Sequence, residues 1–142
     1  MRRLLIPIIA FSFVFASPVV AQTGAEAVNV AVVSRADDIV GSSLVYEVKE
    51  KIRSSSGFRL VEKSRGVLMI IVNTMPKEED NPSVSTIYSV DWVFMAEGNP
   101  LPYIIDSKMG YCGRDVVKSS ARSIVASTDQ VLSEFSDYMR SY

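Results

Sequence analysis

The residues that could do chemistry are few, and their types exclude several familiar reaction classes. The chain has no histidine and one cysteine, Cys112. Without histidine there can be no Ser-His-Asp triad, no Cys-His pair and no histidine-ligated zinc. A lone cysteine also excludes the Cys-x-x-Cys redox motif and an internal disulfide. Carboxylate, lysine, tyrosine or serine chemistry remains, and we predict no cofactor, no metal site and no enzymatic activity.

Four charged residues near one predicted hairpin are the candidates for a ligand or partner site: Asp91, Asp106, Lys108 and Arg114. Asp91 and Asp106 could face each other across the hairpin as a carboxylate pair, or lie on an open, solvated surface. Lys108 and Arg114 flank Gly110-x-x-Gly113, a pattern that resembles a phosphate clamp and equally fits a glycine-rich turn from strand to helix. The helix that follows could bind an anion through its free N–H groups.

Three other features have a simple and a sharper interpretation. Cys112 is either a small buried hydrophobe or a free thiol able to form an intermolecular bridge. Residues 78–80 (Glu-Glu-Asp) form a solvated loop or, less simply, supply calcium ligands, although their contiguous spacing is not that of a calcium loop. An aromatic set forms either a sheet face under helices or a ligand platform; it comprises Tyr88, Trp92, Phe94, Tyr103 and Tyr111.

Hydrophobic periodicity supplies the elements that must position these residues. Apolar residues repeat at helical spacing over 40–52 and 117–138. Strand patterns cover 28–33, 58–61, 67–72, 84–94 and 101–111. The continuous apolar run over 67–72 is typical of a central strand covered on both faces.

This order predicts an α+β fold, β-α-β-β-β-β-α, in which a mixed, mainly antiparallel five-stranded sheet carries two helices on one face as a two-layer sandwich. The last two strands should form an antiparallel hairpin. Its outer face is predicted to carry polar residues that suit water or a polar partner: Ser85, Ser89, Asp91, Asp106 and Lys108.

The first 21 residues predict export. Basic residues at 1–3, an apolar run over 4–15 and small residues at 19–21 match a secretory signal peptide cleaved near Ala21/Gln22, with an uncleaved amino-terminal anchor as the alternative. Residues 22–142 should then form one domain in the periplasm or the extracellular medium, with no further membrane span. Cleavage changes the net charge from −1 to −3. Such a domain shows no electrostatic footprint for nucleic acid or for an anionic membrane surface.

Several stretches resemble a group of uncharacterised small exported proteobacterial proteins. They are Leu44-Val45-Tyr46, residues 55–61, Ile87 to Trp92, and Gly110 to Asp129. The resemblance implies no known activity. It does imply that relatives carry a second cysteine where Ser120 stands, which would make Cys112 a residue that has lost a disulfide partner. The element order is also similar to the amino-terminal domain of the Tol-system periplasmic protein TolB.

We therefore expect a non-catalytic binding or accessory module that engages an envelope or secreted protein through a sheet edge or the polar hairpin face. One alternative is a small-ligand binder or enzyme at the turn 110–114, where Asp106, Lys108 or Arg114 would converge on a concave pocket. Another is an inhibitor of secreted hydrolases that uses the protruding loop 76–82. The sequence does not indicate an oligomeric state.

Overall fold

The computed structural model describes residues 27–98 and 101–140, with side chains only to residue 136 in the last helix. The predicted signal peptide lies outside these residues and stays a prediction. The elements are β1 (Val28–Ala36), α1 (Ile39–Ser54), β2 (Phe58–Leu60), β3 (Leu68–Pro76), β4 (Ser85–Phe94), β5 (Tyr103–Gly113), η1 (Arg114–Val116) and α2 (Val117–Arg140). This is the predicted order, with a short 3₁₀ turn added before the last helix.

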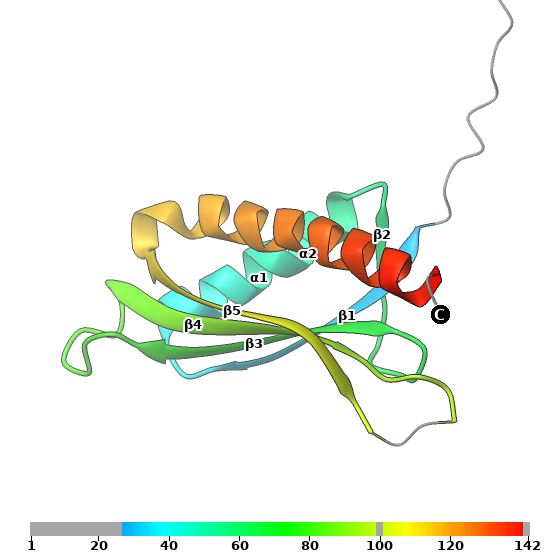
Figure 1. The fold of residues 1–142 in the computed structure, drawn as a ribbon. Coiled ribbons are helices and arrows are strands. Elements are labelled where there is room, and N and C mark those ends of the chain that lie inside the picture. Colours follow the sequence, from blue (N-terminus) through cyan, green and yellow to red (C-terminus); the bar gives the residue numbers. More distant parts are fainter. Residues whose placement is uncertain (1–26, 99–100, 141–142) are drawn as a thin grey trace, which may run out of the picture.

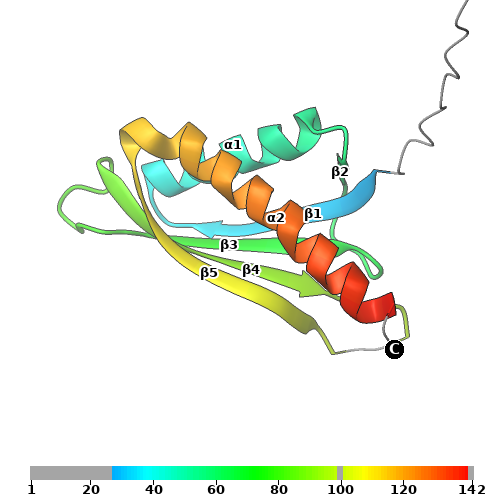
Figure 2. The same cartoon turned by 45° about the horizontal axis from the view of Figure 1, so that its top comes forward.

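One five-stranded sheet of order β2-β1-β3-β4-β5 organises the fold. β1 pairs in parallel with β2 and β3, whereas β4 pairs antiparallel with β3 and β5. Both helices lie on the same face of this sheet (Figure 1, Figure 2). The predicted α+β two-layer sandwich with a mixed sheet is therefore confirmed, and β3 is central as its apolar run indicates.

The main core lies between the helices and the sheet face that they cover, which we call the covered face. Sheet residues Val30, Ile70 and Val90 have no exposed surface, and neither do Leu44 of α1 and Ile124 of α2. These helix residues belong to the predicted apolar stripes, because a spacing of three or four residues returns side chains to one side of a helix. The periodicity in the sequence therefore reports the packing correctly on this face.

Trp92 is the largest fully buried side chain of the covered face. Its Nε1 donates to Thr128 Oγ1 at 2.9 Å, and that hydroxyl donates to the carbonyl of Ile124 at 3.0 Å. A buried indole N–H without a partner would be costly. Thr128 interrupts the apolar stripe of α2 because it supplies that partner.

The opposite side of the sheet is the open face, which neither helix covers (Figure 1). One end of it has a smaller cluster of buried residues, formed by Ala31, Val67, Met69 and Val93. Partly buried neighbours pack on this cluster; they are Val61, Ile71 and Met95. The rest of the open face leaves apolar side chains in solvent.

The predicted assignment of faces in β5 is wrong for the middle of the strand. Asp106 and Lys108 lie opposite Trp92 and Val90 and so face the helices, while Ser107, Met109 and Tyr111 lie on the open face. The large β4 side chains fill the space under α2, so β5 needs little apolar volume there. A bulge between Trp92 and Val93 shifts the register further along the strand.

Candidate functional site

Asp91 and Asp106, the predicted carboxylate pair, do not meet. Asp91 lies opposite Ser107 on the open face, and its Oδ1 accepts from Ser107 Oγ at 2.6 Å. Asp106 lies opposite Trp92 on the covered face, and its Oδ1 accepts from the backbone N–H of Ser107 at 2.8 Å. Because the two carboxylates lie on opposite faces of the sheet, they cannot act together as general acid and base.

Lys108 lies on the covered face rather than on the predicted polar outer face. Its register partner is the fully buried Val90, and its Nζ donates to Ser127 Oγ of α2 at 3.4 Å. The aliphatic stem of the lysine therefore runs along β5 beneath α2, while the ammonium group reaches the rim of the helix. A neutral hydroxyl at this distance holds the ammonium only weakly.

Cys112 is fully buried and free. It lies opposite Thr86, and its Sγ is 3.4 Å from the carbonyl oxygen of Gly113. This burial favours the interpretation as a small hydrophobe over that of a thiol open to intermolecular bridging. Burial, together with the neighbouring Cys112, raises the pKa of Tyr88 above its ordinary value.

The first glycine of Gly110-x-x-Gly113 makes room for a buried ring. A Cβ atom added to Gly110 would lie 2.4 Å from the Oη and Cζ atoms of Tyr88, its register partner on β4. Gly113 has no such neighbour, since its nearest contact would be Val116 at 3.9 Å. The pattern is therefore explained at Gly110 by packing rather than by a phosphate clamp.

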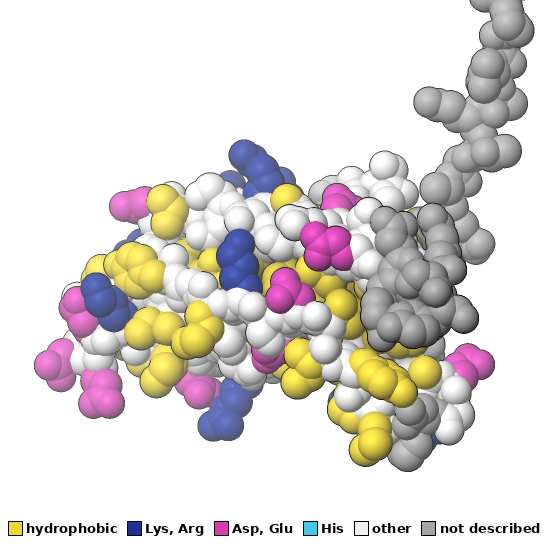
Figure 3. Space-filling view, viewed as in Figure 1, with side chains coloured by type: hydrophobic (Ala, Val, Ile, Leu, Met, Phe, Trp, Pro, Cys, Tyr) yellow, Lys and Arg dark blue, Asp and Glu magenta, His cyan; other side chains and the backbone are white. Residues whose placement is uncertain are grey.

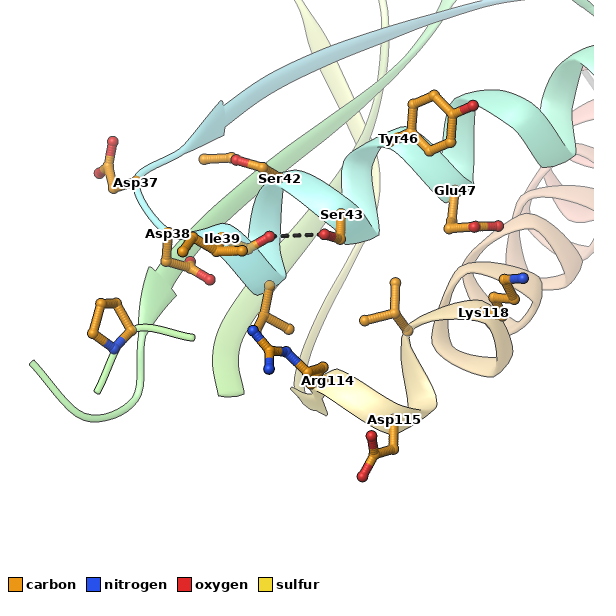
Figure 4. A pocket seen from close by; sticks show the side chains of 14 residues that line it. Asp37, Asp38, Ile39, Ser42, Ser43, Tyr46, Glu47, Arg114, Asp115 and Lys118 are labelled. Carbon is orange, nitrogen blue, oxygen red and sulfur yellow. Dashed lines mark hydrogen bonds between the residues drawn. The ribbon is translucent and has the colours of Figure 1, made fainter. Parts of the chain in front are cut away.

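A groove of about 920 Å³ lies where α1 and η1 begin. Figure 4 shows Arg114 extending from η1 toward the first turn of α1, while Asp115 extends away from it. Acidic, basic and neutral polar side chains line the groove. They are Asp37, Asp38, Glu47 and Asp115, then Arg114 and Lys118, and then Ser42, Ser43 and Tyr46. The predicted pocket near the turn is thus present, but of the three residues expected to converge there only Arg114 lines it.

Asp38 is a buried carboxylate beside this groove, and its contacts with other elements could not be predicted from the sequence. Asp38, which is 6% exposed, caps α1 by accepting from the N–H of Gly41 at 2.6 Å. Its second oxygen accepts from the hydroxyls of Thr74 on β3 at 3.0 Å and Thr86 on β4 at 2.8 Å. One carboxylate therefore caps α1, and through the two threonines it ties the start of α1 to the sheet.

Apolar side chains gather on the open face near the carboxyl end of β3. Met75, Ile87 and Tyr111 form one row across β3, β4 and β5, and Met109 lies in the next row. We call these four residues the open-face patch. Met75 is 58% exposed, Met109 77% and Tyr111 54%. The ammonium of Lys77 lies 4.8 Å from the centre of the Tyr111 ring, a cation–π contact.

A second cavity, of about 430 Å³, lies between the start of β5 and α2. Asp106 and Glu134 are the charged residues among the described side chains that line it; the others are Tyr103, Ile104, Ile105, Val131 and Phe135. Of the predicted aromatic set, Tyr88 and Trp92 are buried under the helices and Phe94 contacts Phe135. Tyr111 instead belongs to the open-face patch.

The remaining features concern metal ligands, the acidic loop and membrane-spanning helices. Within residues 27–98 and 101–140, no three acidic or cysteine side chains are grouped as metal ligands. Glu78, Glu79 and Asp80 are exposed in the loop that projects beyond the sheet between β3 and β4 (Figure 1). No helix in the same part of the chain is long and apolar enough to span a membrane.

The geometry defines an α+β two-layer sandwich with one covered and one open sheet face. No family model matches the chain, and no curated protein matches it either. Among solved structures it is similar to the rare lipoprotein B of Shewanella oneidensis, with 12% sequence identity, a TM-score of 0.32, and coverage of 78% of this chain and 97% of that one. At that TM-score the similarity identifies neither a family nor a function.

Proposed function

We propose that this chain is an exported, non-catalytic binding module of the cell envelope that docks a partner protein on its open sheet face. The observation that carries the proposal is the open-face patch, in which Met75, Met109 and Tyr111 are each more than half exposed on a face that no helix covers. Contiguous exposed apolar surface on a small protein is typical of an interaction site.

The separation of the chemically capable residues supports a non-catalytic role. Asp91 lies on the open face, Asp106 and Lys108 on the covered face, and Cys112 in the core. Catalysis by acid–base or nucleophilic groups needs such side chains within hydrogen-bond reach of one another or of a common substrate. The fold disperses the candidates, so they do not form a catalytic constellation.

The surroundings of the open-face patch indicate the chemistry of the partner. The exposed acids Glu78, Glu79 and Asp80 follow Lys77 in the loop next to the patch. The ammonium of Lys77 itself lies over the ring of Tyr111. The partner surface that fits is therefore apolar at its centre and bordered by lysine or arginine, because opposite charges at the rim steer association.

Site-specific photocrosslinking in the exporting cell tests this function. A photoreactive amino acid replaces Met109 in one variant and Lys63, an exposed residue of the β2–β3 loop, in a matched control. We expect the position 109 probe to yield one discrete adduct that is absent with the probe at Lys63 and is lost when Met75→Ser is added. Equal adducts at both positions, or a measurable turnover with no adduct at position 109, would contradict the proposal.

A small-ligand binder is the second candidate, favoured by the groove of about 920 Å³ at the start of α1 and η1. Its lining includes Arg114 and Lys118 as well as acids, so the fitting ligand carries both charges. Amino acids serve as zwitterionic probes in a thermal-shift screen. A ligand raising Tm in the wild type and in Arg122→Ala, but not in Arg114→Ala, would support this function; no shift with any probe would remove it.

A further inference from the structure

The two edges of the sheet differ in length and exposure. The β2 edge has three residues, whereas the β5 edge has eleven, Tyr103–Gly113, and most of them are exposed. An edge strand presents unpaired N–H and C=O groups to any chain that can lie beside it. We propose that β5 pairs antiparallel with β5 of a second copy of this chain, about a two-fold axis at Ser107, so that two five-stranded sheets become one.

The charges at the centre of β5 specify this register. Asp106 and Lys108 both lie on the covered face, one on each side of Ser107. In an antiparallel pair centred on Ser107, Asp106 lies opposite Lys108 of the second copy, and the two-fold axis repeats that contact. Cross-strand pairs of opposite charge stabilise a sheet, and like pairs destabilise it.

Other registers lose this complementarity. Opposed residues of an antiparallel pair must lie on the same face. The two-fold axis therefore has to pass through a pair of residues that have the same number in the two copies. Centring on Lys108 or on Asp106 would place two like charges in contact. Centring on Met109 would place Lys108 opposite Gly110 and Asp106 opposite Cys112, leaving both charges without a partner on the opposing strand.

Apolar side chains are exposed at both ends of β5. Tyr103 and Ile104 are 50% and 69% exposed at one end, and Met109 and Tyr111 are 77% and 54% exposed at the other. Pairing about Ser107 brings each end of β5 beside the opposite end of the second copy, which reduces the apolar surface left in solvent. Figure 3 looks onto this side of the molecule and shows apolar side chains toward both ends of it, with charged and polar ones among them.

The acidic cavity beside the edge adds to the charge complementarity. Asp106 and Glu134 both line the cavity of about 430 Å³, and no basic side chain lines it among the residues whose side chains the structure describes. Within the described part of its own chain, the ammonium of Lys108 donates to the hydroxyl of Ser127, at 3.4 Å. Across the two-fold axis it would meet the carboxylate of Asp106, which would then give up the bond that its Oδ1 accepts from the N–H of Ser107. Neither Asp106 nor Lys108 belongs to the open-face patch.

Charge exchange tests the interface and its register. Sedimentation velocity over a range of concentrations should show a dimer for the wild type. Asp106→Lys and Lys108→Asp should each weaken dimerisation by about tenfold or more, because each places like charges together twice. The double variant should recover the wild-type constant. A monomeric wild type, or a double variant as weak as the single ones, overturns the proposal.

Disulfide trapping gives an independent readout. Opposed Cα atoms in an antiparallel pair lie about 4.5–5.5 Å apart, within the range that a disulfide bridges. Ser107→Cys should therefore give a covalent dimer on mild oxidation, whereas Ser119→Cys, on the exposed side of α2, should not. Equal yields at the two positions, or trapping of Ser107→Cys only to a different protein, would exclude the homodimer. Photocrosslinking from Met109 to a heavier protein reports on the proposed function separately.

Discussion

Trp92 and Met109 are large apolar residues on neighbouring strands, β4 and β5, yet they have opposite environments. Trp92 lies on the covered face with no exposed surface, and its N–H is satisfied by Thr128. Met109 lies on the open face and is 77% exposed. The covered face uses apolar side chains for stability, whereas the open face leaves them available for binding, so hydrophobicity alone does not report the role of a residue in this sheet.

The comparison also explains why the two faces tolerate different sequences. On the covered face, β5 contributes Gly110, which is small because Tyr88 of β4 fills the space beside it. On the open face, no layer limits the size of Met109 or Tyr111. Close packing constrains volume only where a second layer is present.

The largest expected contrast comes from truncating one residue on each face. Trp92→Ala should lower the free energy of unfolding by about 3–5 kcal/mol, because it leaves a cavity and removes the partner of Thr128. Met109→Ala should change it by less than about 0.5 kcal/mol, since the side chain is already in solvent. Urea denaturation of both variants measures the difference. Similar losses in the two variants would mean that the open face is covered in solution.

The sequence predicts most of the fold because its elements have clear periods. The stripes of α1 and α2 and the alternation of Tyr88, Val90 and Trp92 identify the residues that the covered face buries. In β5 the alternation identifies which residues share a face but not which face is covered, because the large apolar side chains, Met109 and Tyr111, lie on the open face. That choice depends on the volume supplied by β4, which no local pattern contains.

The candidate site is less predictable for a similar reason. Asp38 is recognisable as an N-cap from its place before an apolar stripe, but its two threonine partners lie 36 and 48 residues away in the chain. The groove at Arg114 likewise depends on how α1 and η1 approach each other. Contacts at such separations arise from the packing of whole elements, so single-sequence patterns do not reveal them.

Removing the hydroxyl of Thr86 measures how much its contact with Asp38 contributes to the stability of the fold. Thr86→Val keeps the shape of the side chain but removes the hydroxyl, whose oxygen lies 2.8 Å from Asp38 Oδ2 and 2.9 Å from the carbonyl oxygen of Met75. Hydrogen bonds to a charged group contribute about 1.5–3 kcal/mol, so unfolding should be easier by that amount. Thr86→Ser should recover most of the loss, and thermal or urea unfolding measures both. Equal stability of the valine and serine variants would show that the hydroxyl is not needed.

A matched pair of glycine variants separates packing from backbone freedom on β5. Gly110→Ala should destabilise the protein by about 1–3 kcal/mol, since the added methyl group overlaps the ring of Tyr88. Gly113→Ala should have a much smaller effect, because its Cβ meets only Val116 at ordinary contact distance. Thermal unfolding of both variants provides the measurement. A larger loss of stability for Gly113→Ala than for Gly110→Ala would contradict the explanation of the glycine pattern by packing against Tyr88.

The smallest expected effect concerns the pH dependence of stability at Tyr88. Burial raises the pKa of Tyr88 in the folded chain, so the folded state holds this proton more tightly than the unfolded state. The resulting stabilisation is fully present below the unfolded tyrosine pKa of about 10 and is lost as pH rises through the higher folded value. Stability should therefore fall more steeply above about pH 10 in the wild type than in Tyr88→Phe.

Tyr46→Phe is the matched control for this titration, because Tyr46 lies on α1 and is 60% exposed. Its removal should leave the alkaline slope of the unfolding free energy unchanged, because the side chain lies mostly in solvent. If Tyr88→Phe and Tyr46→Phe had the same alkaline slope as the wild type, the phenol of Tyr88 would be as solvated as that of Tyr46. The covered face would then admit water next to Gly110, and the contrast with the open face would be weaker there.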